Sequence, residues 1–312
     1  MSAEKRIFIT GAAGYIGHQL GHRLAGEHVV SGADIRPRAA EFPIRQMDVR
    51  DPALAELLRA ERITHVVHLA SVLQASPDRA RDYDIDVNGT RNVLEACVAA
   101  GVGHLTVSSS GAAYGYHADN PAWLDEQDAL RGNPEFAYSD HKRLVEEMLA
   151  DYRVRQPQLR QLVFRPGTVL GADTDNQITA LFRRKRLLAI RGSASPFVFI
   201  WDQDVVNAMA HGIAHDSSGC YNMAGDGALS IDEIAALLGK PVRRLPAWLL
   251  QAALAVANPL GLTRYGPEQV NFLRYRPVLS NRRLKEEFGY RPAKTSEDTF
   301  RFFARHALGV PL

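Results

Sequence analysis

Short apolar runs alternate through the first half of the chain with segments whose apolar residues recur every three or four positions. Such runs are typical of buried parallel strands, and the wider spacing is typical of helices that pack on them. Strands are predicted at 7–9, 29–34, 64–70, 104–108 and 159–164, with a short one leading into 47–48. Helices are predicted at 15–24, at 53–59, in a long segment ending near 100, and from about 138 onward. This alternation predicts a doubly wound parallel sheet that binds ligands at the carboxyl ends of its strands.

The alternation becomes irregular after residue 166. We therefore expect an α/β fold in which residues 1–166, joined by about 199–223, form a Rossmann domain that binds NAD. Residues 167–198 and 224–312 are expected to form a smaller, mostly helical domain that binds the substrate.

The longest apolar stretch covers residues 246–262 and is interrupted by Gln251, Asn258 and Pro259. It is shorter than the roughly 20 apolar residues that a transmembrane helix needs, so stable membrane insertion is not expected. We favour a core helix of the second domain. A helix at a membrane interface and the wall of an apolar substrate pocket are the alternatives.

A glycine-rich turn follows the first strand, with Gly11, Gly14 and Gly17 spaced three apart. Glycines in such a turn let the backbone approach a pyrophosphate, which the N-terminal amides of the next helix can then bind. Asp34 ends the second strand, near the spacing at which a carboxylate binds the adenosine ribose. We favour a dinucleotide site over the alternative, an aspartate that only caps its own loop.

The same carboxylate indicates which dinucleotide is bound. Asp34 can accept hydrogen bonds from a ribose diol and would repel a 2′-phosphate, which favours NAD. Arg36 and Arg38 follow closely and could instead recruit the phosphate of NADP.

A second chemical pattern is Tyr138 followed four residues later by Lys142. Residues four apart share one face of a helix, and an ammonium held near a phenol favours the phenolate, as a general base requires. The strand before this helix ends in three serines, 108–110. A serine hydroxyl could hold the substrate oxygen while the tyrosine exchanges a proton and a nicotinamide exchanges a hydride.

Composition is that of an ordinary globular protein: 312 residues, 46% hydrophobic, 23% charged, net charge +2. This balance gives no reason to expect binding to nucleic acid or to an anionic membrane. The two cysteines, Cys97 and Cys220, can supply neither a disulfide framework nor a metal cluster, so no metal is expected. The polar start of the chain runs directly into the first strand without a secretory apolar segment, so we expect a cytoplasmic protein.

Taken in order, these motifs resemble the extended short-chain dehydrogenase/reductase superfamily, within it the NAD-dependent epimerase/dehydratase family and its UDP-glucose 4-epimerase-like subgroup. The matching segments run along almost the whole chain: 10–17, 48–51, 68–71, 88–90, 108–110 with 114–115, 138–142, 164–167, 199–205, 221–225 and 283–290.

The resemblance implies a cofactor site built from many short segments. Asp48 and Val49 would contact the adenine, Lys142 the nicotinamide ribose, and Asn88 would be a structural member of the site. The implied cofactor-binding residues are Gly11, Ala13, Gly14, Tyr15, Ile16, Gly17, Asp34, Ile35, Arg36, Asp48, Val49, Leu69, Ala70, Ser71, Asn88, Ser108, Tyr138, Lys142 and Pro166.

For catalysis the resemblance implies Ser110, Tyr138 and Lys142, with Ser110, Thr168 and Asn176 contacting the substrate. Thr168 stands where nucleotide-sugar epimerases commonly carry an asparagine. The implied enzyme is an NAD-dependent epimerase that transiently oxidises a hydroxyl carbon of a nucleotide sugar. It would be a homodimer joined through helices near 87–100 and 138–152.

Two other functions stay open. One is an alcohol dehydrogenase or carbonyl reductase with an apolar, steroid- or flavonoid-like substrate, because residues 248–256 resemble the carboxyl-terminal region of such reductases. The other is an NAD(P)-sensing protein without turnover.

Several charged or ionisable positions are assigned to structure or solvent. Asp202 and Asp204 precede an apolar helical segment and are expected to cap it, and His141 is expected to be solvated. The cations at 183–186 are expected to form a solvated face, with contact to a substrate phosphate as the alternative.

Overall fold

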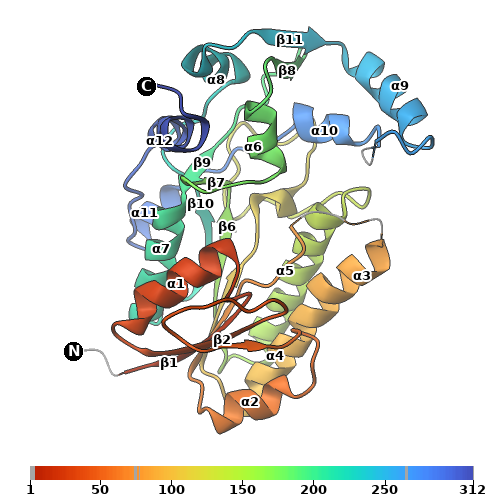
Figure 1. The fold of residues 1–312 in the computed structure, drawn as a ribbon. Helices are drawn as coiled ribbons and strands as arrows, with labels where there is room; N and C mark the ends of the chain where they lie inside the picture. Colours follow the sequence, from red (N-terminus) through yellow and green to blue (C-terminus); the bar gives the residue numbers. More distant parts are fainter. Residues whose placement is uncertain (1–3, 74–75, 77, 264–265, 312) are drawn as a thin grey trace.

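The computed structural model describes residues 4–73, 76, 78–263 and 266–311. A seven-stranded sheet lies at its centre (Figure 1), with strand order β10-β6-β5-β4-β1-β2-β3 and every neighbouring pair parallel. Its strands are β1 (Arg6–Thr10), β2 (Val29–Asp34), β3 (Ile44–Gln46), β4 (His65–His68), β5 (His104–Ser108), β6 (Arg160–Pro166) and β10 (Gly219–Met223). The predicted α/β class with a doubly wound parallel sheet is confirmed.

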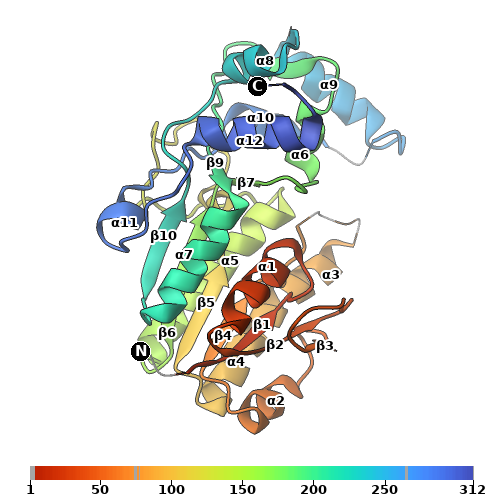
Figure 2. The ribbon, with the colours of Figure 1, turned by 60° about the vertical axis from the view of Figure 1, so that its left-hand side comes forward.

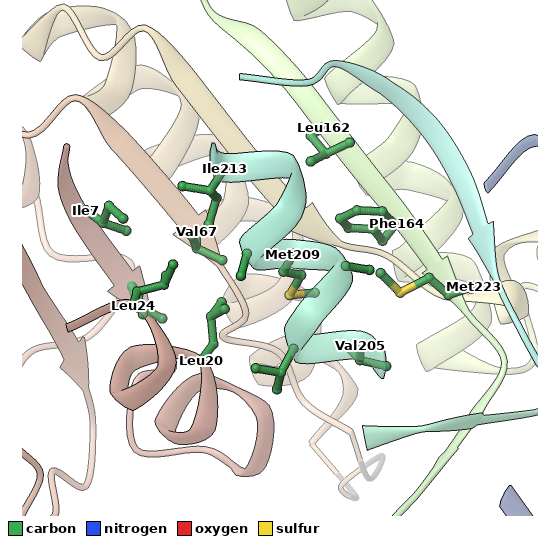
Figure 3. Packing of buried hydrophobic residues seen from close by; sticks show 14 of the residues in the cluster. Ile7, Leu20, Leu24, Val67, Leu162, Phe164, Val205, Met209, Ile213 and Met223 are labelled. Atoms are coloured by element: carbon green, nitrogen blue, oxygen red, sulfur yellow. The ribbon is translucent and has the colours of Figure 1, made fainter. Parts of the chain in front are cut away.

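Helices cover both faces of this sheet, because successive residues of each strand point to opposite sides. Ile7 and Ile9 of β1 pack beneath α1 (Tyr15–Ala25) and α7 (Asp202–Ala214), which lie side by side in Figure 2. Figure 3 shows Leu20 of α1 and Met209 of α7 in this layer. Phe8 points the other way, into a core shared with α2 (Leu54–Ala60), α4 (Gly89–Ala100) and α5 (Ala137–Arg155).

Residues 79–100 depart from the single long helix that the sequence predicts. The structure has a short helix α3 (Arg79–Tyr83), then a π-helical turn over Asp84–Asn88, and only then α4. Such wide turns interrupt helices mostly at functional sites. Here the turn contains Asp86, a buried carboxylate near the centre of the candidate site.

Most of the rest of the described chain mixes strands and helices above the carboxyl ends of the sheet (Figure 1), whereas α11 packs beside β10. Two small parallel sheets pair β7 (Thr168–Leu170) with β9 (Phe199–Trp201), and β8 (Leu187–Ile190) with β11 (Val242–Leu245). The remaining helices are α6 (Gln177–Phe182), α8 (Ile231–Leu238), α9 (Ala247–Ala257), α10 (Gln269–Arg274), α11 (Arg282–Glu286) and α12 (Ser296–Leu308). Phe182, Phe199 and Phe300 are central to the core of this region.

This arrangement bears on the predicted segment 199–223. Its second strand, β10, pairs with β6 at the edge of the central sheet, as expected. Its first strand, β9, pairs instead with β7 in a separate sheet. A division of the chain into two domains at residue 166 stays a prediction.

The expectation of a core helix at 246–262 is wrong. Helix α9 forms there, but none of its residues is buried. It lies at the margin of the molecule, near α10 (Figure 1), so most of its apolar surface faces outward. No helix in the described ranges is both long enough and apolar enough to cross a membrane.

Candidate active site

The glycine turn brings the amino end of α1 against the ends of β1 and β4. Gly11 has φ +69°, and a Cβ there would lie 2.8 Å from the backbone nitrogen of Ala70. A Cβ on Gly17 would collide with the carbonyl oxygen of Gly11. Both positions therefore require glycine, since the backbone segments approach too closely for a side chain.

Asp34 ties this turn to the end of β2. One carboxylate oxygen accepts from the backbone nitrogen of Ala13 at 3.1 Å, and the other from that of Arg36 at 2.9 Å. The aspartate thus caps its own loop and also braces the glycine turn. The side chains of Arg36 and Arg38 are exposed beside it, and Arg38 reaches the carbonyl of Gly14 at 3.5 Å.

The other predicted cofactor residues follow the carboxyl ends of neighbouring strands. They are Gly14, Tyr15 and Ile16 after β1, Ile35 after β2, Asp48 and Val49 after β3, Leu69, Ala70 and Ser71 after β4, Ser108 in β5, and Pro166 in β6. Parallel strands end at one edge of the sheet, so these positions share a single crevice edge.

Asp48 and Asn88 belong to a charged network at the surface. Arg50 pairs with Asp48 at 2.6 Å and with Asp84 at 2.7 Å, and its hydrogen bonds hold the pKa of Asp48 below its usual value. The exposed Asn88 side chain donates to Asp84 at 2.9 Å. Asn88 is therefore part of this surface network and is hydrogen-bonded to Asp84, not to Tyr138 or Lys142.

Tyr138, Lys142 and Ser110 lie around the junction of β5 and α5. Tyr138 is in the first turn of α5, and the Lys142 ammonium is 5.7 Å from the centre of its ring. The same ammonium donates to the carbonyl of Ser108 at 3.0 Å, which fixes it against the end of β5. Ser110 caps a short 3₁₀ turn by accepting from Ala112 at 3.1 Å.

Ser139 links these pieces, since its hydroxyl donates to the carbonyl of Ala112 at 2.7 Å. The structure thus joins the first turn of α5 to the loop that carries Ser110.

His141 is buried, and the expectation that it is solvated is wrong. The π-helical turn packs against this side of α5, so Asp86 reaches the imidazole at 2.9 Å. Asp86 also accepts from the Ser71 hydroxyl at 3.0 Å. Although burial acts to raise the pKa of Asp86, its bond to His141 and the charge of Lys142 keep that pKa below its usual value.

A small cavity beside Lys142 is lined in part by His68, Asp86 and Thr90. His68 bonds Thr10 at 2.7 Å and Thr90 at 3.0 Å. Burial lowers the pKa of His68 to about 3, and the nearby charge of Lys142 acts in the same direction. The imidazole is therefore neutral at physiological pH.

A buried ion pair supports the far side of this junction. Arg165 of β6 pairs with Glu146 of α5 at 2.6 Å, both side chains being more than nine-tenths buried. Glu146 also accepts from the Ser109 hydroxyl at 2.5 Å, and Arg165 donates to the Tyr114 hydroxyl at 2.8 Å. The serine loop is thereby held between α5 and β6.

Of the predicted substrate residues, Ser110 lies beside Tyr138, whereas Thr168 and Asn176 belong to the mixed region. Thr168 is a partly exposed residue of β7. Asn176 caps α6, its amide oxygen accepting from the backbone nitrogens of Ile178 and Thr179. The oxygen of Asn176 is thus occupied by the helix cap, which leaves its amide NH₂ for other contacts.

Sequence reasoning missed Arg276. Its guanidinium stacks 3.8 Å from the ring centre of Phe197 and 5.2 Å from that of Phe272, and donates to Ser195. It has no salt bridge with any carboxylate of the described residues, and burial lowers its pKa to about 9. Phe272 in turn packs against Tyr116 at 5.3 Å. The local sequence shows only that Arg276 follows two aromatic residues, Phe272 and Tyr275.

Asp202 and Asp204 act in structure, as expected, although Trp201 is the cap of α7. Asp202 accepts from the Tyr15 hydroxyl at 2.5 Å, and burial together with this bond raises the pKa of Tyr15 to about 12. Asp204 accepts from the Tyr290 hydroxyl at 2.8 Å. Within the described residues, no cluster of three or more His, Cys, Asp or Glu side chains could hold a metal ion.

Residues 7–224 match the family model described as the NAD dependent epimerase/dehydratase family. The chain belongs to this family. The resemblance inferred from its motifs is confirmed, and the protein is an enzyme of the epimerase/dehydratase type.

The chain is similar in sequence to an uncharacterized protein and to a UDP-glucose 4-epimerase. An uncharacterized protein of Mycobacterium tuberculosis is 22% identical, the match covering 95% of this chain and 82% of the relative. A UDP-glucose 4-epimerase of Rhizobium leguminosarum bv. trifolii is 32% identical over 186 residues, which cover 56% of this chain and 55% of that protein.

Solved structures of the family share the fold. A UDP-glucose-4-epimerase from Stenotrophomonas maltophila, with bound NAD and formylated UDP-arabinopyranose, superimposes with a TM-score of 0.76 at 19% identity, covering 98% of both chains. The Thermotoga maritima UDP-glucose 4-epimerase, solved with UDP-glucose, superimposes with a TM-score of 0.75 at 18% identity. The match covers 96% of this chain and 98% of that one.

Proposed function

We propose that this family member is an NAD-dependent epimerase of a nucleotide sugar that uses Tyr138 as its proton acceptor. The observation that carries the proposal is the Tyr138–Lys142 pair, with the ammonium 5.7 Å from the phenol ring and anchored to the end of β5. A sensor of NAD that performs no chemistry has no need of a phenol placed beside a fixed cation.

The residues present fit the proposed cofactor. A Cβ on Gly11 or Gly17 would collide with neighbouring backbone, so the turn stays tight. The backbone amides at the start of α1 would then be available to bind a pyrophosphate. Asp34 offers carboxylate oxygens beside this turn, which suits a ribose diol and disfavours a 2′-phosphate. When bound, NAD would supply the hydride acceptor and donor. Titration with both dinucleotides tests this choice, and tighter binding of NADP would show it to be wrong.

The protein's own side chains would supply proton transfer and substrate positioning. Tyr138 would take the proton from a substrate hydroxyl, and Lys142 would stabilise the phenolate from one turn away. Ser110, on the loop that Ser139 fastens to α5, would hold the substrate oxygen. Epimerisation requires the same proton to be returned to the oxygen, so one tyrosine serves both directions.

Arg276 favours a nucleotide sugar over an apolar substrate. A partly buried guanidinium without a carboxylate partner is costly unless an anion joins it. Its stacking on Phe197 and Phe272 holds the guanidinium plane for a bidentate contact. The diphosphate of a nucleotide sugar would provide the anion. The Arg276→Gln variant is expected to raise KM for such a substrate with little change in kcat.

The decisive experiment is a screen of nucleotide sugars and apolar ketones with added NAD. We expect interconversion of epimers without net NADH, and a loss of about 10²- to 10⁴-fold in kcat for Tyr138→Phe. Tyr152→Phe, on the same helix, is the matched control and should retain activity. Net NADH formation or consumption with an apolar substrate would instead support the alcohol dehydrogenase or carbonyl reductase. Full activity of Tyr138→Phe would remove the catalytic assignment.

A further inference from the structure

Helix α9 and the turn after it form an apolar surface that the described part of the protein does not cover. Trp248 is 68% exposed, Val256 64% and Leu262 77%. Trp248, Ala252 and Val256 recur every four residues, so they share the outward face of the helix. A face of this kind on an otherwise polar surface marks an interaction site.

Positive charge gathers on the strands that lead into this apolar surface, although Asp175 pairs with Arg183 and Asp232 with Arg244. Residues 176–201 and 234–263, which contain the paired strands β8 and β11, hold eight lysines and arginines and no acidic residue. Since the whole chain has a net charge of only +2, the remainder is net acidic. Within these two ranges, five exposed cations make no salt bridge among the described residues: Arg184, Lys185, Arg186, Arg191 and Arg243.

The fold puts both features on one margin of the molecule. β11 runs through Pro246 directly into α9, and the backbone nitrogen of Arg191 donates to Leu245 at 2.9 Å, beside the start of that helix. Arg243 of β11 is in register with Leu188 of β8, two residues beyond the end of the cationic run at Arg186. In Figure 1 these strands and α9 lie together, at the end of the molecule opposite α2.

We propose that this margin binds an anionic lipid bilayer, with α9 lying flat in the headgroup region. The outward apolar face would enter the acyl boundary while the exposed cations contact lipid phosphates. With 11 residues, α9 is about 16 Å long, which suits a helix in the plane of the interface. A second copy of the chain is a poorer partner, because a twofold contact through α9 would bring the two cationic clusters together. This inference does not depend on the proposed reaction.

The test is flotation of the full chain with vesicles of phosphatidylcholine alone or mixed with phosphatidylserine. We expect binding only to the mixed vesicles, weakened by added salt. The double variant Leu249→Glu with Val256→Glu should bind at least about tenfold more weakly, since it places charge on the apolar face. Val154→Glu, at an exposed valine of α5, is the matched control and should bind as the unmodified chain does.

A second variant tests the charges without touching α9. Reversal of Arg184, Lys185 and Arg186 to glutamate should also weaken binding by about tenfold or more, and thermal unfolding should show that the fold is kept. Absence of binding to mixed vesicles would overturn the proposal, as would wild-type binding by either variant. If the unmodified chain were a dimer and Leu249→Glu made it monomeric, the surface would instead bind a second copy of the chain.

Discussion

His68 illustrates how the protein keeps an ionisable side chain neutral at the floor of the candidate site. Its two ring nitrogens bond the Thr10 and Thr90 hydroxyls, which can adapt to a neutral imidazole. Burial lowers its pKa to about 3, reinforced by the charge of Lys142. A neutral His68 places no second positive charge beside the lysine that is proposed to stabilise the Tyr138 phenolate.

This neutrality makes stability depend on pH. The unfolded chain binds a proton on His68 near pH 6.5, whereas the folded chain does so only near pH 3, so stability is lost as the pH falls through this window. At pH 5 the loss from this residue should be about 2 kcal/mol. In urea unfolding at pH 7.5 and 5, His68→Gln should show a smaller difference between the two pH values than the unmodified chain. His306→Gln, at an exposed position, is the control. If all three proteins lost the same free energy of unfolding between pH 7.5 and 5, the expectation would be contradicted.

At this scale, the sequence predicts what depends on local spacing. Tyr138 and Lys142 are one helical turn apart, so their proximity follows from the chain itself. The prediction of a solvated His141 rests on its place off the Tyr138–Lys142 face, and it is wrong because Asp86, 55 residues away in the sequence, covers the imidazole. The same holds for Arg276, since its stacking partner Phe197 precedes strand β9 and is distant in the sequence.

The glycine turn is the element in which sequence and backbone geometry correspond most directly. Gly17→Ala should lower the free energy of unfolding by about 1–3 kcal/mol, because the added Cβ collides with the carbonyl oxygen of Gly11. Gly26→Ala, at the other end of α1, is the matched control. Its Cβ would meet no atom within 4 Å and its φ of −72° suits alanine, so its effect should be neutral or stabilising by about 0.4–1 kcal/mol.

Urea denaturation of both variants measures the difference. Equal stability of Gly17→Ala and Gly26→Ala would show that the turn tolerates a side chain, and would weaken the case for a backbone shaped to approach a pyrophosphate.

The sequence predicts the bounds of elements that belong to the central sheet, but it does not predict the burial of elements that depend on partners distant in the sequence. The strands β2 and β5 have the predicted bounds, and most of their residues are buried on both faces of the sheet. Helix α9 is as apolar as a core helix, yet what decides its burial is whether another element covers it. The apolar composition of a helix predicts that its surface will be covered, but it does not predict which element or partner covers it.

At the scale of the whole molecule, the proposed homodimer has a surface to account for it. Leu144, Met148 and Tyr152 recur every four residues along α5 and are each partly exposed. Such a stripe on a long helix can pack against its symmetry mate in a twofold interface. Packing against the sheet also explains part of this pattern, since Met148 and Tyr152 contact the core beneath α5.

Light scattering on a gel-filtration column distinguishes the two explanations. We expect the unmodified chain to elute as a dimer and Met148→Glu as a monomer, because a charge buried in a twofold interface is doubled by symmetry and left unpaired. Leu249→Glu, on the apolar face of α9, should remain dimeric, since the cations near that face oppose self-association. A monomeric unmodified chain, or a dimeric Met148→Glu variant with native thermal unfolding, would exclude α5 as the dimer interface.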